Sequence, residues 1–499
     1  MATILLNGSP VNVISGCTLS QAIHEYEQID TPCGCKGRCG KCKVFAKGDL
    51  SEISESERKF LSNDEIENGI RLACYTIVNG DCEVKTFEKT KSHVLLNNNF
   101  HKNSGNAIFS KFAIAIDIGT TTIAGCLYST SGDILAKDGF ANPQSRWGAD
   151  VISRIDSALH GEAEKLAECI QNAINQLVYK LVDNANINID DIDCMIIAGN
   201  TAMLYLLTKI SPLCLSHAPF EVDHFFGEFV SAQTLNLSCK NATVYLPRCI
   251  SAFVGADTTV AILASEITTN RSSVKMLVDI GTNGEVALWN NGKLLCCSTA
   301  AGPAFEGAGI TMGMNGKDGA IDHVFIENNQ IKAHVLGDIQ PIGICGSGII
   351  DALSCFLEKD LMDENGFLST DPTTVYKNVA VYQKDVRSIQ LAKSAISAGI
   401  TTLIKSEGLN LDDIDMLAIA GGFGSYLDVK NAGKIGLIPN ELTNKVNVLG
   451  NAVLKGAGMI LFDKNMLTLS ENLAKCATTI DLSTSQTFFQ EYTENMYFY

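Results

Sequence analysis

The chain has 499 residues, 46% of them hydrophobic and only 10 of them proline, so it is long enough for two to four globular domains. A formal net charge of −17 argues against nucleic acid as a partner, because neutralising phosphates requires a basic face. Residues 1–20 lack the basic start of a signal peptide, and no uncharged apolar stretch approaches the length of a membrane helix. We therefore expect a cytoplasmic protein with reduced thiols and no membrane partner.

Residues 1–88 are expected to form a small α+β domain. Its expected elements, in order, are a strand over 3–6, a turn at Asn7-Gly8, a strand over 11–14, a helix that begins near Thr18 or Ser20, a strand over 42–46, a charged helical stretch over 51–68, and two strands around 73–78 and 82–87 joined at Asn79-Gly80.

The loop TPCGCKGRCGKCK, residues 31–43, concentrates the cysteines. Its thiols at positions 33, 39 and 42 are separated by five and then two residues, and another cysteine follows at position 74. Plant-type ferredoxins have a similar arrangement, in which three thiolates on one loop and a distant fourth hold a 2Fe-2S cluster. The pattern predicts such a cluster, with the ligands Cys33, Cys39, Cys42 and Cys74.

A zinc site, a disulfide pair and scattered thiols are the alternatives to a cluster. Zinc usually binds two C-x-x-C pairs or added histidines, whereas this loop has one such pair and no histidine near it. Gly34, Gly37 and Gly40 also favour the cluster, because a loop around bridging sulfides needs backbone that can take positive φ. Cys35 is an extra thiol in the loop, and we favour Cys33 as the first ligand because the spacing from Cys35 is too short for the plant-type pattern.

From residue 89 to residue 111 the hydrophobic rhythm stops and the sequence becomes rich in asparagine, which predicts a flexible linker. The eleven cysteines beyond position 82 are spread singly, apart from Cys296 and Cys297. Most of them are expected to be small core residues.

An internal repeat appears from Phe112 onward. FAIAIDIGTTTIAGCLY (112–128) is echoed by MLVDIGTNGEVALW (276–289), and NINIDDIDCMIIAGNTA (186–202) is echoed by GLNLDDIDMLAIAGGFG (408–424). The repeat predicts two α/β lobes, about 112–265 and 266–470, followed by a tail over 471–499. The second lobe must hold about sixty additional residues between its two matching segments.

Each lobe begins with an apolar strand that ends in Asp-Ile-Gly-Thr and turns into a second strand, and such a hairpin can surround phosphate oxygens with amides and hydroxyls. Asp117 and Asp279 are expected to project toward one point, where a magnesium ion on phosphates needs carboxylate or water partners. The turn Ala420-Gly421-Gly422-Phe423-Gly424 suits close backbone approach to a nucleotide. The chain has no G-x-x-x-x-G-K-[ST] motif, so the two hairpins would hold the nucleotide.

These motifs together resemble a known family, the reductive activators of corrinoid proteins, over nearly the whole chain. The motifs that carry the resemblance are CGCKGRCGKC, DIGTTT, RWGADVISRI (146–155), AGNTAM, VGADTT (254–259), DIGTNGE, AAGPAFEGAGI (300–310), GICGSGIID (343–351), AGGFGSYLD and LSTSQTFFQEY. The resemblance implies an α+β, β-grasp ferredoxin domain followed by a duplicated two-lobed α/β ATPase of the actin-like (ASKHA, ribonuclease H-like) class.

The resemblance also implies an enzyme that uses ATP to return an inactive Co(II) corrinoid to Co(I), with an electron that passes through the 2Fe-2S cluster. ATP and Mg²⁺ would be the other cofactors, a corrinoid protein and a reduced ferredoxin or similar donor the partners, and a homodimer the assembly. By position, the catalytic candidates are Asp117, Asp279 and Glu285. The nucleotide-binding candidates are Thr120, Thr121, Thr122, Gly281, Thr282, Asn283, Gly421, Gly422 and Phe423. The loop Ser298–Gly309 is a candidate for facing the corrinoid partner or, equally, a connection within the lobe.

The chain departs from the family pattern in two ways: Cys35 stands where glycine is usual, and the linker runs directly into the ATPase, without the middle domain of longer members. Three other functions are compatible with the sequence. They are a small-molecule kinase with a redox-sensing domain, an activator of 2-hydroxyacyl-CoA dehydratases, and a nucleotide-dependent scaffold with a structural cluster.

Overall fold

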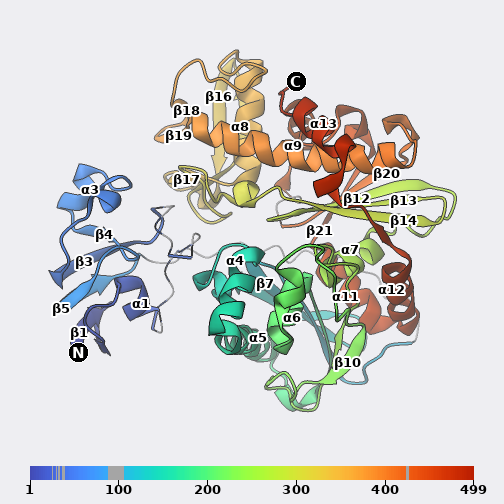
Figure 1. Ribbon diagram of the computed structural model, residues 1–499, viewed down its shortest axis with the longest axis horizontal. Coiled ribbons are helices and arrows are strands. Elements are labelled where there is room, and N and C mark those ends of the chain that lie inside the picture. Colours follow the sequence, from blue (N-terminus) through green and yellow to red (C-terminus); the bar gives the residue numbers. More distant parts are fainter. Residues whose placement is uncertain are drawn as a thin grey trace. The chain divides into compact units, whose positions relative to one another are not determined.

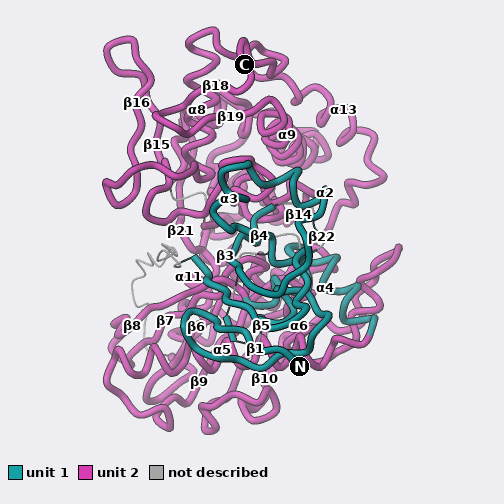
Figure 2. Tube along the Cα trace, turned by 90° about the vertical axis from the view of Figure 1, so that its left-hand side faces the viewer, with its two compact units in different colours: residues 1–90, 143–160 teal, residues 91–142, 161–499 magenta. Residues whose placement is uncertain are grey.

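The computed structural model describes residues 1–24, 26, 27, 29, 31, 34, 35, 37, 40–87, 106–422 and 426–499. The chain forms two compact units (Figures 1 and 2). The first comprises Met1–Thr90 and Pro143–His160, and the second comprises Lys91–Asn142 and Gly161–Tyr499. None of the helices within these described ranges is long and apolar enough to cross a membrane.

The first unit contains a five-stranded sheet with the order β2-β1-β5-β3-β4, in which only β1 and β5 are parallel. Its elements are β1 (Ala2–Leu6), β2 (Ser9–Val13), α1 (Leu19–Ile23), β3 (Lys43–Leu50), α2 (Glu55–Arg58), α3 (Asn63–Glu67), β4 (Ile70–Leu72), β5 (Val78–Lys85), η1 (Pro143–Arg146) and α4 (Val151–Ser157), and η2 (Ala158–Glu162) follows. Alternate residues of β1 are buried, as expected for a strand with one face on a core. The expected β-grasp arrangement is confirmed.

Helix α1 begins where the sequence predicts it. Thr18 caps the helix with its side chain, and Gln21 completes a reciprocal capping box. The charged stretch over 51–68, expected to be helical, is divided into α2 and α3, because Ser54 and Ser62 each cap a new helix start.

The expected hairpin turn at Asn79-Gly80 is wrong. Both residues lie inside the single strand β5, whose buried Val78 and Cys82 both face β3 partners. The register with β3 shifts between Gly48 and Leu50, so the residues around Gly80 form an irregularity in a continuous strand. Pairing on both sides of the dipeptide therefore overrides its preference for a turn.

Residues 106–111, the described end of the expected linker, pack onto the second unit; the rest of the linker lies outside the described residues. The amide of Ile108 donates to Leu461 O at 2.9 Å, and the Phe109 ring meets the Phe462 ring edge to face at 5.1 Å. Ser110 also donates its amide to Asp193 at 2.8 Å. This end of the expected linker is therefore part of the folded unit.

The second unit has two six-stranded sheets that repeat one plan (Figure 1). The first sheet has the order β10-β11-β9-β6-β7-β8 and the second has the order β21-β20-β12-β13-β14-β22. The strands of the first lobe are β6 (Phe112–Ile118), β7 (Thr122–Ser129), β8 (Ile134–Ala141), β9 (Ile192–Gly199), β10 (Glu228–Ser231) and β11 (Thr243–Leu246). Those of the second sheet are β12 (Val274–Ile280), β13 (Gly284–Asn290), β14 (Lys293–Thr299), β20 (Met416–Ala420), β21 (Val446–Gly450) and β22 (Thr478–Thr479).

Register confirms the duplication. Asp117 at the end of β6 lies beside Ala198 of parallel strand β9, and Asp279 at the end of β12 lies beside Ala420 of parallel strand β20. The helices of the first lobe are α5 (Ala163–Ala185), α6 (Thr201–Thr208) and α7 (Ala256–Ser265), and those of the second are α9 (Gln383–Ser406), α10 (Val429–Lys434), α11 (Ala452–Phe462), α12 (Lys464–Cys476) and α13 (Gln486–Glu494).

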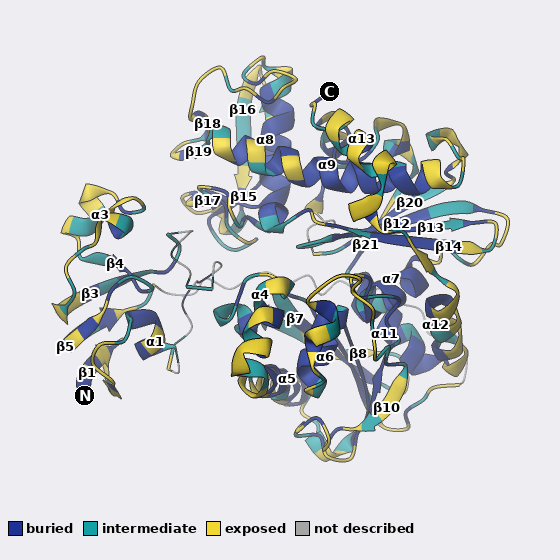
Figure 3. Ribbon diagram, viewed as in Figure 1, coloured by how far each residue is buried: buried dark blue, intermediate teal, exposed yellow. Residues whose placement is uncertain are grey.

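The additional residues expected in the second lobe lie between β14 and α9. They form a subdomain of β15 (Ala320–Glu327), β16 (Gln330–Val335), β17 (Gly343–Ile344), α8 (Gly346–Glu358), β18 (Thr373–Tyr376) and β19 (Val379–Val381). Helix α9 is buried along much of its length between this subdomain, the sheet and α13 (Figure 3).

Helices α7 and α11 join the two lobes through a shared apolar core. A Cβ at Gly456 of α11 would lie 2.0 Å from the carbonyl oxygen of Val260 in α7, so the two backbones approach closely. The lobes therefore meet along a helix pair that also packs on β6, β9 and β12.

The C-terminal tail of the chain is folded into the second lobe. Strand β22 extends the sheet beside β14, and α13 packs on α9. Gln390 and Ser394 of α9 donate to the carbonyl oxygens of Met496 and Asn495 at 2.6 and 2.7 Å, while the ring of Phe498 is buried.

Candidate functional site

Two of the expected cluster ligands, Cys42 and Cys74, lie side by side in the first unit. Cys42 precedes β3 and is buried, and Cys74 lies in the turn after β4. Their Sγ atoms are 3.3 Å apart, and the amide of Ala73 donates to Cys42 O at 2.9 Å. The expected ligands Cys33 and Cys39 lie outside the described residues.

The thiol pair fits a metal cluster. A separation of 3.3 Å is well beyond the roughly 2.05 Å of a disulfide. It is close to the spacing of two thiolates on one tetrahedral metal ion, which is about 3.8 Å for metal–sulfur bonds of about 2.3 Å. Within the described ranges no group of three or more His, Cys, Asp or Glu side chains is placed to hold one metal ion, and Cys42 and Cys74 are the two expected ligands that the structure describes.

Glycines in the cysteine loop take the backbone conformation that the sequence predicts. Gly34, Gly37 and Gly40 all have positive φ. At Gly37 a Cβ would lie 2.4 Å from the Tyr75 hydroxyl, which donates to Gly37 O at 2.7 Å. Cys35 has a φ of 60°, so a non-glycine residue occupies a left-handed position beside Gly34.

A buried ion pair supports the turn that carries Cys74. Glu57 is completely buried and accepts from Arg71 Nε at 2.9 Å and from Arg71 Nη2 at 3.0 Å. The same carboxylate accepts from Leu72 N at 2.8 Å and from Thr76 Oγ1 at 3.3 Å. Helix α2 is therefore tied to both sides of Cys74 through one side chain.

Most cysteines of the second unit are core residues, as expected. Cys249 and Cys296 are buried, and burial raises the pKa of each thiol to about 12. Thiols as deeply buried as these two are typical of small core residues.

The first candidate phosphate hairpin joins β6 to β7. Gly119 N donates to Thr122 O at 2.8 Å, which closes the turn. Thr120 is buried and accepts from the Asn200 side chain, the N-cap of α6, at 3.1 Å. The Thr121 hydroxyl faces the second lobe, 3.3 Å from the Thr282 hydroxyl.

The second hairpin, between β12 and β13, has a turn one residue shorter, which Gly281 N closes by donating to Asn283 O at 2.9 Å. Gly421 has a φ of 99°, and a Cβ there would lie 2.3 Å from Ile280 O, so only glycine fits beside this hairpin. A Cβ at Gly422 would meet no atom within 4 Å, which leaves room for a ligand. Phe423 lies outside the described residues.

Four carboxyl groups cluster where the hairpins meet: Asp117, Asp257, Asp279 and Glu285. Asp279 and Glu285 face each other across β12 and β13, a pairing of like charges that destabilises a sheet. No lysine or arginine within the described ranges forms an ion pair with any of the four. The cluster therefore lacks cationic compensation from these side chains.

Burial raises the pKa of all four groups, and neighbouring carboxylates raise it further in three of them, although each residue keeps some exposed surface. Burial, Asp257 and Asp279 raise the pKa of Asp117 to about 7, although a hydrogen bond from Asn451 opposes the change. Burial and Asp257 likewise raise the pKa of Asp279 to about 7. Burial raises the pKa of Asp257 to about 6, and burial, Asp257 and Asp279 raise the pKa of Glu285 well above its ordinary value. Such perturbation is typical of functional sites.

Three residues of this site were not among the expected ones. Asp257 lies in the first turn of α7, within the VGADTT motif. Asn451 caps α11 and donates to Asp117 Oδ2 at 3.1 Å. Glu306 comes from the loop that was a candidate for facing the partner, and it accepts from Thr121 and Thr282. At this residue, the loop faces the two hairpins.

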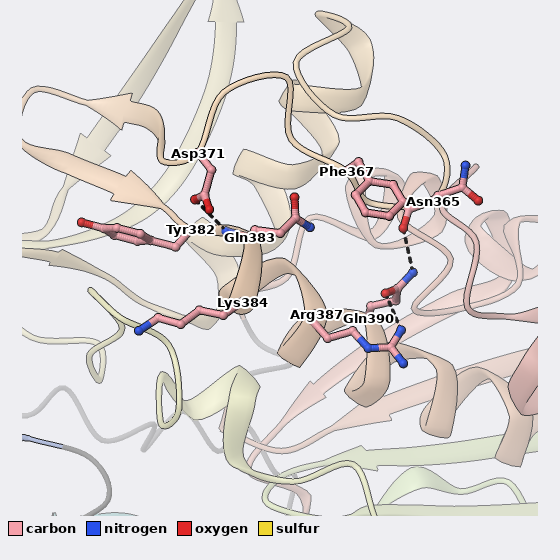
Figure 4. Close-up of a pocket in the computed structure, with 8 residues that line it drawn as sticks. All are labelled: Asn365, Phe367, Asp371, Tyr382, Gln383, Lys384, Arg387 and Gln390. Atoms are coloured by element: carbon pink, nitrogen blue, oxygen red, sulfur yellow. Dashed lines mark hydrogen bonds between the residues drawn. The ribbon is translucent and has the colours of Figure 1, made fainter. Parts of the chain in front are cut away.

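A separate cavity of about 670 Å³ lies at the start of α9 (Figure 4). It is lined by Asn365, Phe367, Asp371, Tyr382, Gln383, Lys384, Arg387 and Gln390. None of these residues belongs to the carboxyl cluster, and Arg387 is held by Gln390 at 2.8 Å. The cavity therefore has no direct part in the site described above.

Family models match both units. Residues 4–79 match a model described as a 2Fe-2S iron-sulfur cluster binding domain. Residues 112–270 match the RACo middle region, and residues 273–499 match the C-terminal domain of RACo, the ASKHA domain. The middle region of the family model therefore corresponds to the predicted first ATPase lobe, and the absence of an additional domain found in longer members stays a prediction.

Individual proteins are similar over most of the chain. One from Eubacterium limosum, named corrinoid activation enzyme RamQ, is 34% identical over 422 residues, which are 78% of this chain and 70% of the relative. One from Methanosarcina barkeri, named Co(II) methylated amine-specific corrinoid protein reductase, is 24% identical over 76% of this chain and 75% of the relative. A solved structure of a reductive activator for corrinoid, iron-sulfur protein has a TM-score of 0.73 at 27% identity and covers 100% of this chain and 98% of that chain.

Proposed function

Because this chain belongs to the family of reductive activators of corrinoid proteins, we propose that it uses ATP to reduce an inactive Co(II) corrinoid protein to the Co(I) form. The observation that carries the proposal is the presence in one chain of two distinct sites. One is the Cys42–Cys74 thiol pair in a β-grasp unit, and the other is a carboxyl cluster between two phosphate-type hairpins.

The cysteine loop is the electron-transfer site. A 2Fe-2S cluster bound by Cys33, Cys39, Cys42 and Cys74 would supply a one-electron carrier. The chain positions two of these thiols through the Ala73–Cys42 hydrogen bond and the buried Glu57 side chain. Tyr75 fixes the loop on the opposite side by its hydrogen bond to Gly37 O.

The two hairpins are the nucleotide site. Hydroxyls of Thr121 and Thr282 and the hairpin amides would donate to phosphate oxygens. Gly421 and Gly422 would border the adenosine, since one excludes a side chain by contact and the other faces open space.

Asp117, Asp257, Asp279 and Glu285 are proposed to orient Mg²⁺ on the nucleotide. Their donor set suits this ion, which prefers oxygen ligands. Because the described side chains contain no group of three placed to hold a metal, phosphate oxygens and water would complete the coordination. Binding of the cation would draw protons from the carboxyl groups, since an adjacent positive charge favours the ionised form.

ATP is needed because reduction to Co(I) is uphill for an ordinary cluster, and plant-type clusters lie near about −400 mV. ATP can supply the missing free energy only through a conformational change that alters the affinity of the protein for one state of its corrinoid partner. The two lobes, joined at α7 and α11, provide such an element, since a nucleotide that contacts both hairpins favours one lobe arrangement.

The proposal includes a reduced ferredoxin or similar protein as donor, a homodimeric assembly and a cytoplasmic location. Thiolate ligands require a reducing compartment, which favours the cytoplasm.

The test compares Cys42→Ala with Asp279→Ala in the presence of donor, MgATP and a Co(II) corrinoid protein, with the visible spectrum followed for Co(I). Cys42→Ala should lose Co(I) formation and keep nucleotide binding. Asp279→Ala should keep the cluster absorbance and lose ATP-dependent turnover. Normal cobalt reduction by Cys42→Ala would contradict the electron path, and substrate-stimulated ATP use with no corrinoid present would favour a kinase.

A further inference from the structure

One carboxylate connects the two phosphate-type hairpins. Glu306 Oε2 accepts from Thr121 Oγ1 at 2.7 Å and from Thr282 Oγ1 at 3.0 Å. Thr121 belongs to the hairpin of the first lobe and Thr282 to the hairpin of the second, and their hydroxyl oxygens are 3.3 Å apart. The three side chains therefore bridge the two lobes at a single point.

The backbone around Glu306 leaves it little freedom to move. The residue ends the short helix η5 (Pro303–Glu306), and its neighbour Phe305 is buried in the core of the second lobe. Gly307 has a φ of 77°, and a Cβ there would lie 2.6 Å from Met314 N. Both flanks of Glu306 are thus packed, so the carboxylate is aimed at the hairpins.

Thr121 is also fixed from behind. Its carbonyl oxygen accepts from Asn142 N at 2.7 Å, and the Asn142 side chain donates to Gly119 O at 2.8 Å. Asn142 itself is completely buried. The Thr121 hydroxyl therefore comes from a rigid turn. The backbone stays in place, and the hydroxyl can exchange its hydrogen-bond acceptor Glu306 for another acceptor.

The chemistry of the bridge makes it compete with phosphate. A threonine hydroxyl has one proton to donate, so it cannot donate to Glu306 and to a phosphate oxygen at the same time. A carboxylate within hydrogen-bond distance of both hydroxyls also repels an anion placed on them. A divalent cation on the phosphates lowers their net negative charge and so weakens that repulsion.

We propose that Glu306 is a specificity-determining residue that makes nucleotide binding depend on a divalent cation, because its carboxylate occupies the hydroxyl donors of both hairpins and repels phosphates that carry no metal. The inference rests on the proposed function in one respect, because it assumes that the nucleotide phosphates bind at the two hairpins.

Calorimetric titration of the full-length protein with ATP, in Mg²⁺ and separately in EDTA, tests the proposal. In Glu306→Gln the carboxylate becomes a neutral amide of nearly the same shape. We expect the variant to bind ATP in EDTA about tenfold more tightly than the parent, the effect of removing one close like charge, with MgATP affinity within about threefold. Glu306→Ala should change the EDTA value in the same direction.

Glu327→Gln is the matched control, since it removes one carboxylate from an exposed position at the end of β15 in the same lobe. It should leave both affinities unchanged. The proposal would be overturned if the ratio of the ATP dissociation constants in EDTA and in Mg²⁺ were unchanged in both Glu306 variants. Loss of MgATP binding in these variants would also overturn it, because Glu306 would then be a ligand of the cation. A parent protein that binds no nucleotide in either condition would instead contradict the proposed function.

Discussion

Glu57 in the first unit and the four-carboxyl cluster in the second unit have opposite surroundings. In the first unit Glu57 is completely buried and meets Arg71, Leu72 N and Thr76, so its charge and lone pairs are satisfied. In the second unit Asp279 faces Glu285, and these two groups lie near Asp117 and Asp257 with no basic partner among the described side chains.

The difference separates structure from function. A buried carboxylate with an arginine and backbone donors holds a fold together, because every group has a partner. A cluster of carboxyls with raised pKa values costs stability, and proteins keep such clusters where a ligand or cation completes them. We therefore expect the first unit to hold its site in one geometry and the second to gain stability when a ligand or cation binds its carboxyl groups.

Glu57→Gln should give the largest change in stability. The substitution leaves Arg71 buried without its anionic partner, which typically costs about 3–5 kcal/mol. Calorimetric unfolding of the iron-free chain should show the first unit melting at a clearly lower temperature. Glu83→Gln is the control, since Glu83 pairs with Lys85 at an exposed position, and it should change melting little. Equal melting temperatures for Glu57→Gln and Glu83→Gln would mean that the buried pair does not support the unit.

Asp279→Asn should stabilise the second unit and abolish ATP-dependent turnover. Burial and Asp257 raise the pKa of Asp279 to about 7, against an ordinary value of 3.8. The folded state therefore holds a proton that the unfolded state has lost, and the stability contribution falls as the pH rises from about 4 to about 7. At pH 8 the variant should gain about 1–2 kcal/mol, because an amide avoids the repulsion.

Thermal unfolding between pH 5 and pH 8, in EDTA and without nucleotide, checks this sign. The parent should lose stability of the second unit as the pH rises, and Asp279→Asn should show a flatter profile. If the variant follows the same profile as the parent and is less stable at pH 8, the carboxyl cluster is not under electrostatic strain.

Tyr75→Phe removes one hydrogen bond from the cysteine loop without changing the ring. The hydroxyl donates to Gly37 O at 2.7 Å, and such a bond contributes about 0.5–1.5 kcal/mol. We expect faster release of iron during chelator challenge, with unchanged nucleotide affinity. Unchanged iron release would show that the loop does not depend on this contact.

Cys35→Gly should have the smallest effect. Cys35 has a φ of 60°, which costs a non-glycine residue about 1 kcal/mol, so glycine should relax the backbone. Iron content per chain should stay at the parental value, because we assign the first ligand to Cys33. Loss of iron in this variant would identify Cys35 as a ligand.

Periodicity and repeats predicted most of the fold because they are local or duplicated signals. The two Asp-Ile-Gly-Thr hairpins and their parallel neighbours were visible in the sequence, and the register of Asp117 with Ala198 and of Asp279 with Ala420 agrees with them. The Asn79-Gly80 turn failed because pairing with β3, a contact between distant segments, overrode a dipeptide preference.

The site was predicted in part for the same reason. Asp117 and Asp279 stand out because they occur twice in the same setting, and the structure brings them together. Asp257 and Glu306 occur once each, in motifs for which no role at the nucleotide was expected, and only folding shows that they lie near the hairpins. The support from Glu57 has no sequence signal, because a glutamate in a charged stretch is usually exposed.

The most direct test of the account is the yield of Co(I) when the donor-reduced protein meets a Co(II) corrinoid protein with and without MgATP. We predict Co(I) formation that requires both the nucleotide and the thiol pair at Cys42 and Cys74. Equal formation of Co(I) without nucleotide, or an anaerobically prepared protein that contains zinc and no iron, would contradict the central claim that one chain couples nucleotide binding to an uphill electron transfer.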